Sequence, residues 1–218
     1  MKKNSPVAPR ALLFLIALIA WFAIAAQFSI SIPLLLAKGM TYGEAVWRMF
    51  GYLTILTNVL VAVACSVLLL KPDSAPGQYF SRPGVQTAIT LYIIIVGLGY
   101  NVLLRNHAPF TGLHRLSDES LHTVVPLLYL FYWLSYVPKS GLRAKDSLLW
   151  LVYPLAYFAM AMLRGGSSGF YPYPFLNVTN LGYARVMGNA AMLLAGFFVL
   201  ALALVAIAKF RRNALVTD

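Results

Sequence analysis

Residues 11–36 read ALLFLIALIAWFAIAAQFSISIPLLL, an apolar run that contains no charged side chain. A helix that crosses a bilayer needs about 20 apolar residues, because each residue adds about 1.5 Å along the helix axis. The run is therefore long enough to span. Basic residues precede it, and Ala23-Ile24-Ala25 matches the pattern of a signal-peptide cleavage site. Because the apolar run continues to Leu36, beyond the length of a signal-peptide core, we expect a retained first helix.

The composition of the whole chain follows the same pattern. Of the 218 residues, 61% are apolar and 11% are charged, and the mean hydropathy is +0.76, whereas soluble domains are about half apolar and about a quarter charged. Charged and turn residues separate six apolar segments, namely 11–36, 49–70, 86–104, 120–137, 147–163 and 186–208. We predict an all-α polytopic membrane protein, a bundle of six transmembrane helices that forms a single domain over residues 1–218.

The basic residues indicate how this bundle is oriented. In a soluble protein the net charge of +11 would favour nucleic acid, but here the Lys and Arg lie at the ends of apolar segments, so no nucleic-acid partner is expected. More of the 17 basic residues lie on the side of the termini and of the second and fourth loops, as do Lys71, Arg82, Lys139 and Arg143. The positive-inside rule then places both termini in the cytoplasm. We expect a multi-pass protein of the cell membrane, plasma or inner, with membrane lipids as partners.

Polar residues within the apolar segments carry the information about function, because such groups are costly in a bilayer. If the second segment is one helix from residue 49, Thr54 lies about 9 Å inside the outer boundary marked by Arg48. By the same count His122 lies about 6 Å inside it. The other polar residues expected at this depth are Thr57, Asn58, Asn101 and Asn189. One interpretation is that these side chains only form hydrogen bonds between helices; the other is a polar site in the outer half of the membrane.

A histidine beside a hydroxyl can form a nucleophile and base pair, because an imidazole that accepts the proton activates the alcohol. Asp118 and Glu119 precede His122 by about one helical turn, so either carboxylate could orient the imidazole. Alternatively, these two carboxylates form ion pairs with Arg105 or Arg115. The asparagines Asn58, Asn101 and Asn189 are candidates for orienting the pair or for donating to an oxyanion.

Other chemistries have less support from the residues. A haem-binding bundle needs pairs of intramembrane histidines, but we expect His107 and His114 in a loop, because Pro109 and Gly112 lie between them. The histidines also lack carboxylate or cysteine partners at compact metal-ligand spacing. No P-loop or GxGxxG motif is present. The single cysteine, Cys65, has no partner for a disulfide and is expected to be a small buried side chain. We predict no metal and no cofactor.

Three segments together resemble a known family. They are Gly51-Tyr52-Leu53-Thr54-Ile55-Leu56-Thr57-Asn58, Leu121-His122-Thr123-Val124-Val125-Pro126 and Tyr171-Pro172-Tyr173-Pro174-Phe175-Leu176. In their order and spacing they are similar to the androgen-induced and androgen-dependent TFPI-regulating protein family and its bacterial six-span relatives. The resemblance implies a multi-pass hydrolase that cleaves fatty acid esters of hydroxy fatty acids, with Thr54 as nucleophile and His122 as base. The chain departs from the family pattern in a shorter segment between these two positions and in Thr57-Asn58.

The leading hypothesis is therefore an intramembrane threonine hydrolase whose substrate is a lipid ester. The alternative is a transporter or binding protein for a lipid or small molecule that uses the same polar groups, and a third possibility is a structural subunit in which they only join helices. The aromatic segment 170–176 has two interpretations as well, an anchor at the membrane interface or a lid over the site.

Overall fold

The computed structural model describes residues 10–105 and 110–214, and every regular element in these ranges is a helix. The chain divides into two compact units, Met1–Pro138 and Lys139–Asp218. The elements of the first unit are α1 (Arg10–Leu36), α2 (Tyr42–Met49), α3 (Leu53–Leu70), α4 (Ala75–Phe80), α5 (Pro83–Gly99), η1 (Tyr100–Leu104), α6 (Gly112–Glu119), η3 (Ser120–Val124) and α7 (Val125–Tyr136). Those of the second unit are α8 (Asp146–Trp150), α9 (Val152–Ser168), η4 (Pro174–Leu176) and α10 (Val178–Ala214).

Five helices among the described residues are long and apolar enough to cross a membrane. They are Arg10–Leu36, Leu53–Leu70, Pro83–Leu104, Asp146–Ser168 and Val178–Arg211. Each overlaps one of the apolar segments expected from the sequence, so the chain has the character of a multi-pass membrane protein. Pro33 lies near the end of the first of these helices, which continues to Leu36.

The fourth expected segment, 120–137, has a different form. Elements α6, η3 and α7 follow one another without a gap, and η3 is a π-helical segment between two α-helices. A second π-helical segment, η1, continues α5. In π-helix the hydrogen bonds join residues five apart in place of four, and such segments are rare and concentrated at functional sites.

The expectation of one helix from residue 49 to residue 70 is wrong. A separate short helix, α2, ends at Met49, and α3 begins only at Leu53. Thr41 and Glu44 form a capping box at the start of α2: each side chain bonds to the backbone N–H of the other residue. The Glu44 carboxylate accepts a hydrogen bond from the Thr41 N–H and a second one from the Thr41 hydroxyl, and these two bonds, the first being the larger cause, hold the pKa of Glu44 below its usual value. Thr54 is therefore the second residue of α3, and the depth estimated from Arg48 does not apply.

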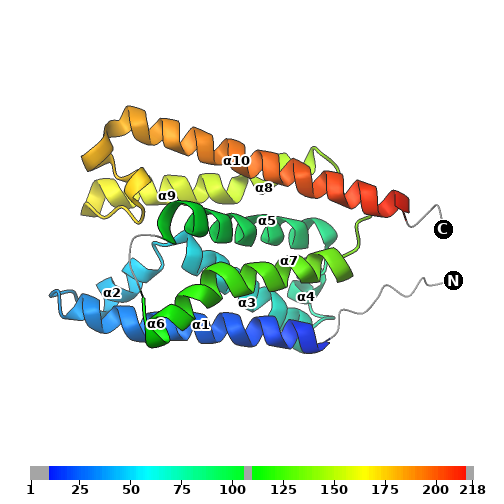
Figure 1. Ribbon diagram of the computed structural model, residues 1–218, viewed down its shortest axis with the longest axis horizontal. Helices are drawn as coiled ribbons and strands as arrows, with labels where there is room; N and C mark the ends of the chain where they lie inside the picture. Colours follow the sequence, from blue (N-terminus) through cyan, green and yellow to red (C-terminus); the bar gives the residue numbers. More distant parts are fainter. Residues whose placement is uncertain (1–9, 106–109, 215–218) are drawn as a thin grey trace. The chain divides into compact units, whose positions relative to one another are not determined.

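The first unit is held together by close packing of α1 on α3 and on α6. Small residues such as Ala20 and Ala62 are fully buried, which allows the helices to approach closely. Cross-helix hydrogen bonds accompany this packing: the Trp21 indole donates to Ser66, and the Ser117 hydroxyl donates to the Ala23 carbonyl at 2.9 Å. Cys65 is buried and free, as expected. Helix α5 lies alongside α7 (Figure 1) and also contacts α3.

In the second unit the helix expected over residues 147–163 extends further than the apolar segment. Residues up to Ser168 continue α9, and the turn begins only at Gly169, whose φ of 70° favours glycine. Gly165 has a packing role instead, since a Cβ there would overlap the Tyr171 ring. The last helix also begins earlier than the expected residue 186, because α10 starts at Val178 with non-helical backbone at Gly182.

Candidate functional site

Thr54 and His122 lie within hydrogen-bond distance of each other. Thr54 Oγ1 is 3.3 Å from His122 Nε2, although the two residues are far apart in the sequence. Thr54 stands in the first turn of α3, and His122 is the central residue of η3. Both side chains are half-buried. The structure thus brings together the two residues that the sequence analysis selected as nucleophile and base.

The surroundings of the imidazole determine which of its nitrogens carries the proton. His122 Nδ1 lies 3.1 Å from the Asp118 carboxylate oxygen Oδ1 and 3.0 Å from the Asp118 backbone carbonyl oxygen. Both neighbours are acceptors, so Nδ1 must carry the hydrogen and donate it. Nε2 of the neutral ring is then unprotonated, and it can accept a proton from the Thr54 hydroxyl. This is the tautomer that a general base needs.

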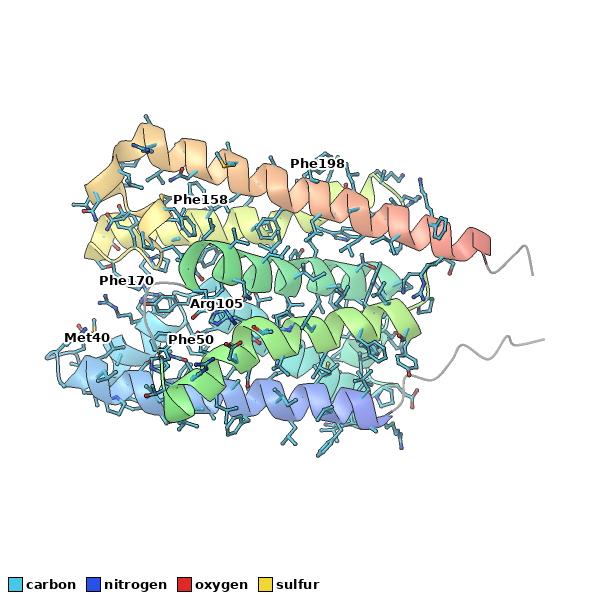
Figure 2. All side chains as sticks on the ribbon, in the orientation of Figure 1. Met40, Phe50, Arg105, Phe158, Phe170 and Phe198 are labelled. Carbon is cyan, nitrogen blue, oxygen red and sulfur yellow. The ribbon has the colours of Figure 1, made fainter. Side chains whose placement is uncertain are left out.

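The two carboxylates that precede His122 have different partners. Asp118 is buried and bonds to His122, whereas Glu119 forms an ion pair with Arg105 at 2.6 Å. Thr123 joins this ion pair, since its hydroxyl donates to Glu119 at 3.0 Å. Arg105, labelled in Figure 2, directly follows η1. Of the two alternatives left open by the sequence, the ion pair applies to Glu119 and the contact with the imidazole applies to Asp118.

Tyr100 is a further member of the cluster that the sequence analysis missed. Its ring is stacked on the His122 imidazole, with the ring centroids 3.7 Å apart and the planes inclined by 12°. Its hydroxyl donates to Asp118 Oδ2 at 2.7 Å. The only sequence signal for Tyr100 is its place next to Asn101, because tyrosines are common in membrane helices near the interface and do not by themselves indicate a site.

Pro126 explains the unusual backbone at His122. A proline has no N–H and its ring blocks the carbonyl four residues earlier, which here belongs to His122. The backbone responds by forming η3, in which the Val125 N–H bonds to the Ser120 carbonyl, five residues back. In the same five-residue spacing, the Leu121 carbonyl would pair with the N–H of residue 126. Residue 126 is proline and has no N–H, so this carbonyl receives no backbone hydrogen bond from it.

Asn58 and Asn101 supply the donors that Pro126 lacks. The Asn58 amide nitrogen donates to the Leu121 carbonyl at 3.2 Å and to the Thr54 carbonyl at 2.9 Å. The Asn101 amide nitrogen donates to the His122 carbonyl at 3.2 Å and to the Gly97 carbonyl at 2.8 Å. Both hydrogens of each side-chain amide are thereby used. The two asparagines therefore orient the helical turn that carries His122. An oxyanion could accept a hydrogen bond from either side-chain amide only after one of these bonds had broken.

Gly97 allows α5 to approach the same turn. A Cβ at this position would lie 3.0 Å from the His122 carbonyl oxygen and 3.1 Å from Cβ of Pro126, both closer than normal van der Waals contact. A larger residue would push the His122 backbone away from η1. Gly97, Tyr100 and Asn101 therefore hold His122 from one helix, and Asn58 holds the preceding carbonyl from another.

Asn189, the remaining candidate, lies in the second unit. Its amide nitrogen donates to the Phe175 carbonyl at 2.9 Å, and this bond ties α10 to the aromatic segment of that unit. Phe175 stacks on Tyr173 with a centroid distance of 5.2 Å. Asn189 thus has a structural partner of its own within Lys139–Asp218.

The first unit therefore contains a hydroxyl, an imidazole and a carboxylate connected in series, which is an arrangement able to activate a nucleophile. Within residues 10–105 and 110–214, no three His, Cys, Asp or Glu side chains come together as metal ligands; His107 lies outside these ranges. No family model, no curated protein and no solved structure matches the chain.

Proposed function

We propose that the protein is an intramembrane threonine hydrolase that cleaves a lipid ester. The observation that carries the proposal is the series Thr54 Oγ1, His122 and Asp118, with separations of 3.3 and 3.1 Å. A threonine hydroxyl is a weak nucleophile until a base accepts its proton. An imidazole held in the correct tautomer by a carboxylate is such a base.

In the first half of the reaction Thr54 Oγ1 attacks the ester carbonyl carbon while its proton passes to His122 Nε2. The positive charge on the imidazole is balanced by Asp118, to which Nδ1–H donates. The bond between the carbonyl carbon and the alcohol oxygen then breaks, and His122 returns the proton to the leaving alcohol. An acyl ester of Thr54 remains.

In the second half a water molecule attacks the acyl ester, and its proton passes to His122 Nε2. The new bond joins the water oxygen to the acyl carbon, and the bond to Thr54 Oγ1 breaks. His122 returns the proton to Thr54, and the free fatty acid leaves. The net reaction is ester plus water giving acid plus alcohol, with the protein unchanged.

The negative charge that develops on the carbonyl oxygen needs donors close to Thr54. Leu56 makes the first backbone hydrogen bond into α3, to the Tyr52 carbonyl, so the N–H groups of Leu53, Thr54 and Ile55 precede the helical ladder. No side chain caps this helix end. In this mechanism these amides, at the positive end of the helix dipole, stabilise the oxyanion.

The proposal includes a membrane topology. In the proposed topology the five long apolar helices and the continuous run α6, η3 and α7 act as six spans. The positive-inside rule supports a cytoplasmic location of both termini in this topology, with the site in the outer half of the cell membrane. The proposed substrate of the hydrolase is a membrane lipid, an ester of a hydroxy fatty acid or a close analogue. The resemblance to the androgen-induced and androgen-dependent TFPI-regulating protein family supports the same activity and the same two residues.

The test is hydrolysis of a panel of long-chain lipid esters by purified protein in detergent. Thr54→Ala and His122→Ala should abolish turnover, and Thr54→Ser should retain part of it because the hydroxyl is kept. Thr90→Ala is the matched control, since the Thr90 hydroxyl bonds within its own helix to the Gln86 carbonyl. Intact-mass spectrometry after rapid quenching should detect an acyl adduct on Thr54.

Two results would count against the hydrolase. Turnover by a well-folded Thr54→Ala variant would exclude Thr54 as the nucleophile. No turnover by folded wild-type protein on any ester would favour the alternative function, a lipid or small-molecule transporter or binding protein.

A further inference from the structure

Tyr100 makes two contacts with the candidate site, one through its ring and one through its hydroxyl. We propose that Tyr100 is a positioning residue, which fixes the Asp118 carboxylate and the His122 imidazole in the geometry that Thr54 needs. This inference rests on the proposed hydrolase function for its effect on turnover. The geometric part of it does not depend on that function.

The hydroxyl acts on Asp118. This carboxylate is buried, and its two oxygens have separate partners: Oδ2 accepts from Tyr100 at 2.7 Å, and Oδ1 faces His122 Nδ1 at 3.1 Å. A short bond to one oxygen fixes the rotation of the whole carboxylate. Without the Tyr100 hydroxyl, the carboxylate could turn away from the imidazole toward another donor.

The ring acts on His122. The two planes are nearly parallel, with an inclination of 12°, so Tyr100 covers one face of the imidazole. The two ring nitrogens lie at the edge of the imidazole, where they contact Asp118 and Thr54. Rotation of the imidazole out of this plane would take Nε2 away from Thr54 Oγ1. The electron-rich face of a tyrosine also stabilises a neighbouring cation. The ring therefore favours the imidazolium that forms when His122 accepts the proton.

The backbone around Tyr100 keeps both contacts in place. Gly97 lies against the His122 carbonyl, and the Asn101 side chain donates to that same carbonyl at 3.2 Å. Tyr100 thus lies between two residues that fix the distance from η1 to His122. Because Gly97 and Asn101, which precede and follow Tyr100 in the sequence, both contact the His122 carbonyl, the Tyr100 ring is held against the imidazole.

Two substitutions separate the contributions of ring and hydroxyl. Tyr100→Phe keeps the stacked ring and removes the bond to Asp118, whereas Tyr100→Leu removes both contacts. In metal sites, loss of a residue that orients a ligand histidine costs about 10- to 100-fold in activity, and a comparable loss is expected for the imidazole of His122. We expect kcat to fall about 10-fold in Tyr100→Phe and about 100-fold in Tyr100→Leu, with KM unchanged because Tyr100 acts through His122 and Asp118.

The pH profile gives a readout that a purely structural role would not change. In Tyr100→Phe the Asp118 carboxylate can turn away from the imidazole, so it stabilises the protonated imidazole less. The acidic limb of kcat/KM should therefore move to lower pH. The other charged or titratable groups near the pair are His114 and Glu119 on α6 and Arg105 after η1, and the substitution alters none of them. Tyr129→Phe is the matched control, because the buried Tyr129 hydroxyl has no hydrogen-bond partner among the described residues.

A second measurement is independent of turnover. Nitrogen NMR of histidine-labelled protein in detergent, with His122→Gln to assign the signals, reports which imidazole nitrogen carries the proton. Wild type should show His122 protonated on Nδ1, and Tyr100→Leu should show a mixture of tautomers. A tautomer change in protein that hydrolyses no ester would support the positioning role and reject the hydrolase. Active variants with wild-type kcat, pH profile and NMR signals would overturn the positioning role and leave the hydrolase in place.

Discussion

The two compact units of the chain differ in what they bury. In Met1–Pro138 the buried polar or charged side chains are Thr57, Asn58, Gln86, Thr87, Thr90, Ser117, Asp118 and Ser120. Among the described residues of Lys139–Asp218, the corresponding set contains only Ser147. Polar groups in the interior of a membrane protein are costly and are retained where they do something. The first unit therefore keeps polar side chains whose burial costs free energy and which packing alone does not require.

The backbones differ in the same way. Both π-helical segments, η1 and η3, belong to the first unit and carry Tyr100, Asn101 and His122. Among the described residues of the second unit, the glycines with positive φ are Gly141, Gly169 and Gly182, and η4 is a short 3-10 segment. In the first unit the π-helical segments instead carry side chains of the candidate site.

The largest effect should come from Asp118→Asn, because an amide in place of the carboxylate removes the charge that balances the imidazolium and leaves only the backbone carbonyl of residue 118 to hold the Nδ1–H tautomer of His122. We expect kcat to fall about 10³-fold with the fold retained. The matched change in the second unit is Asp146→Asn, since Asp146 pairs with the exposed Arg143 at 3.5 Å. Ester hydrolysis assays on the two variants side by side check this. Equal activity in both would remove Asp118 from the mechanism.

A smaller effect is expected for Asn58→Ala, which withdraws two donated hydrogen bonds, one to the Leu121 carbonyl beside His122. Leaving a buried carbonyl without a donor costs about 1–3 kcal/mol, so the variant should unfold at a lower temperature and also lose activity. Asn189→Ala withdraws the bond to the Phe175 carbonyl and should lower stability alone. Thermal unfolding measured together with turnover separates the two results. A loss of turnover in Asn189→Ala comparable to that in Asn58→Ala would break the contrast between the units.

The smallest effect is expected for Gly97→Ala. The added methyl group would lie 3.0 Å from the His122 carbonyl oxygen. Overpacking of this kind lowers the free energy of unfolding by about 1–3 kcal/mol. A shift of His122 by a few tenths of an ångström should lower kcat several-fold. Gly99→Ala lies on the same helix and meets no atom within 4 Å, so its kcat should equal that of wild type. Identical kinetics of the two variants would show that the approach of α5 to η3 does not set the position of His122.

The helices and part of the site could be predicted from the sequence because their signals are local. Apolar runs predict the five helices that are long and apolar enough to cross a membrane, and a histidine within an apolar segment is rare enough to select His122. The capping box of Thr41 and Glu44 is also a local signal, and it would have predicted α2. The apolar pattern alone predicts a single helix over residues 49–70, and a depth for Thr54 counted from Arg48 is wrong because α2 and α3 are separate.

The rest of the site could not be predicted because it depends on contacts between distant helices. Asn58 and Asn101 stand out as polar residues in apolar segments, but nothing in the sequence says that both bond to carbonyls next to His122. Tyr100 is indistinguishable from other tyrosines near a membrane interface until its ring is seen against His122. Helix periodicity gives the face of each residue, whereas the pairing of faces is a property of the packed bundle.

Because Pro126 has no N–H, the residues at positions 58, 101 and 126 should vary together among related sequences. While residue 126 is proline, asparagines at 58 and 101 satisfy the carbonyls at 121 and 122. Once residue 126 has an N–H, an ordinary α-helix becomes possible there and both asparagines lose their task. Relatives of this chain should therefore inherit Asn58, Asn101 and Pro126 as a set or lose them as a set. Co-inheritance of the three would mark the lineages in which the histidine turn has kept its shape.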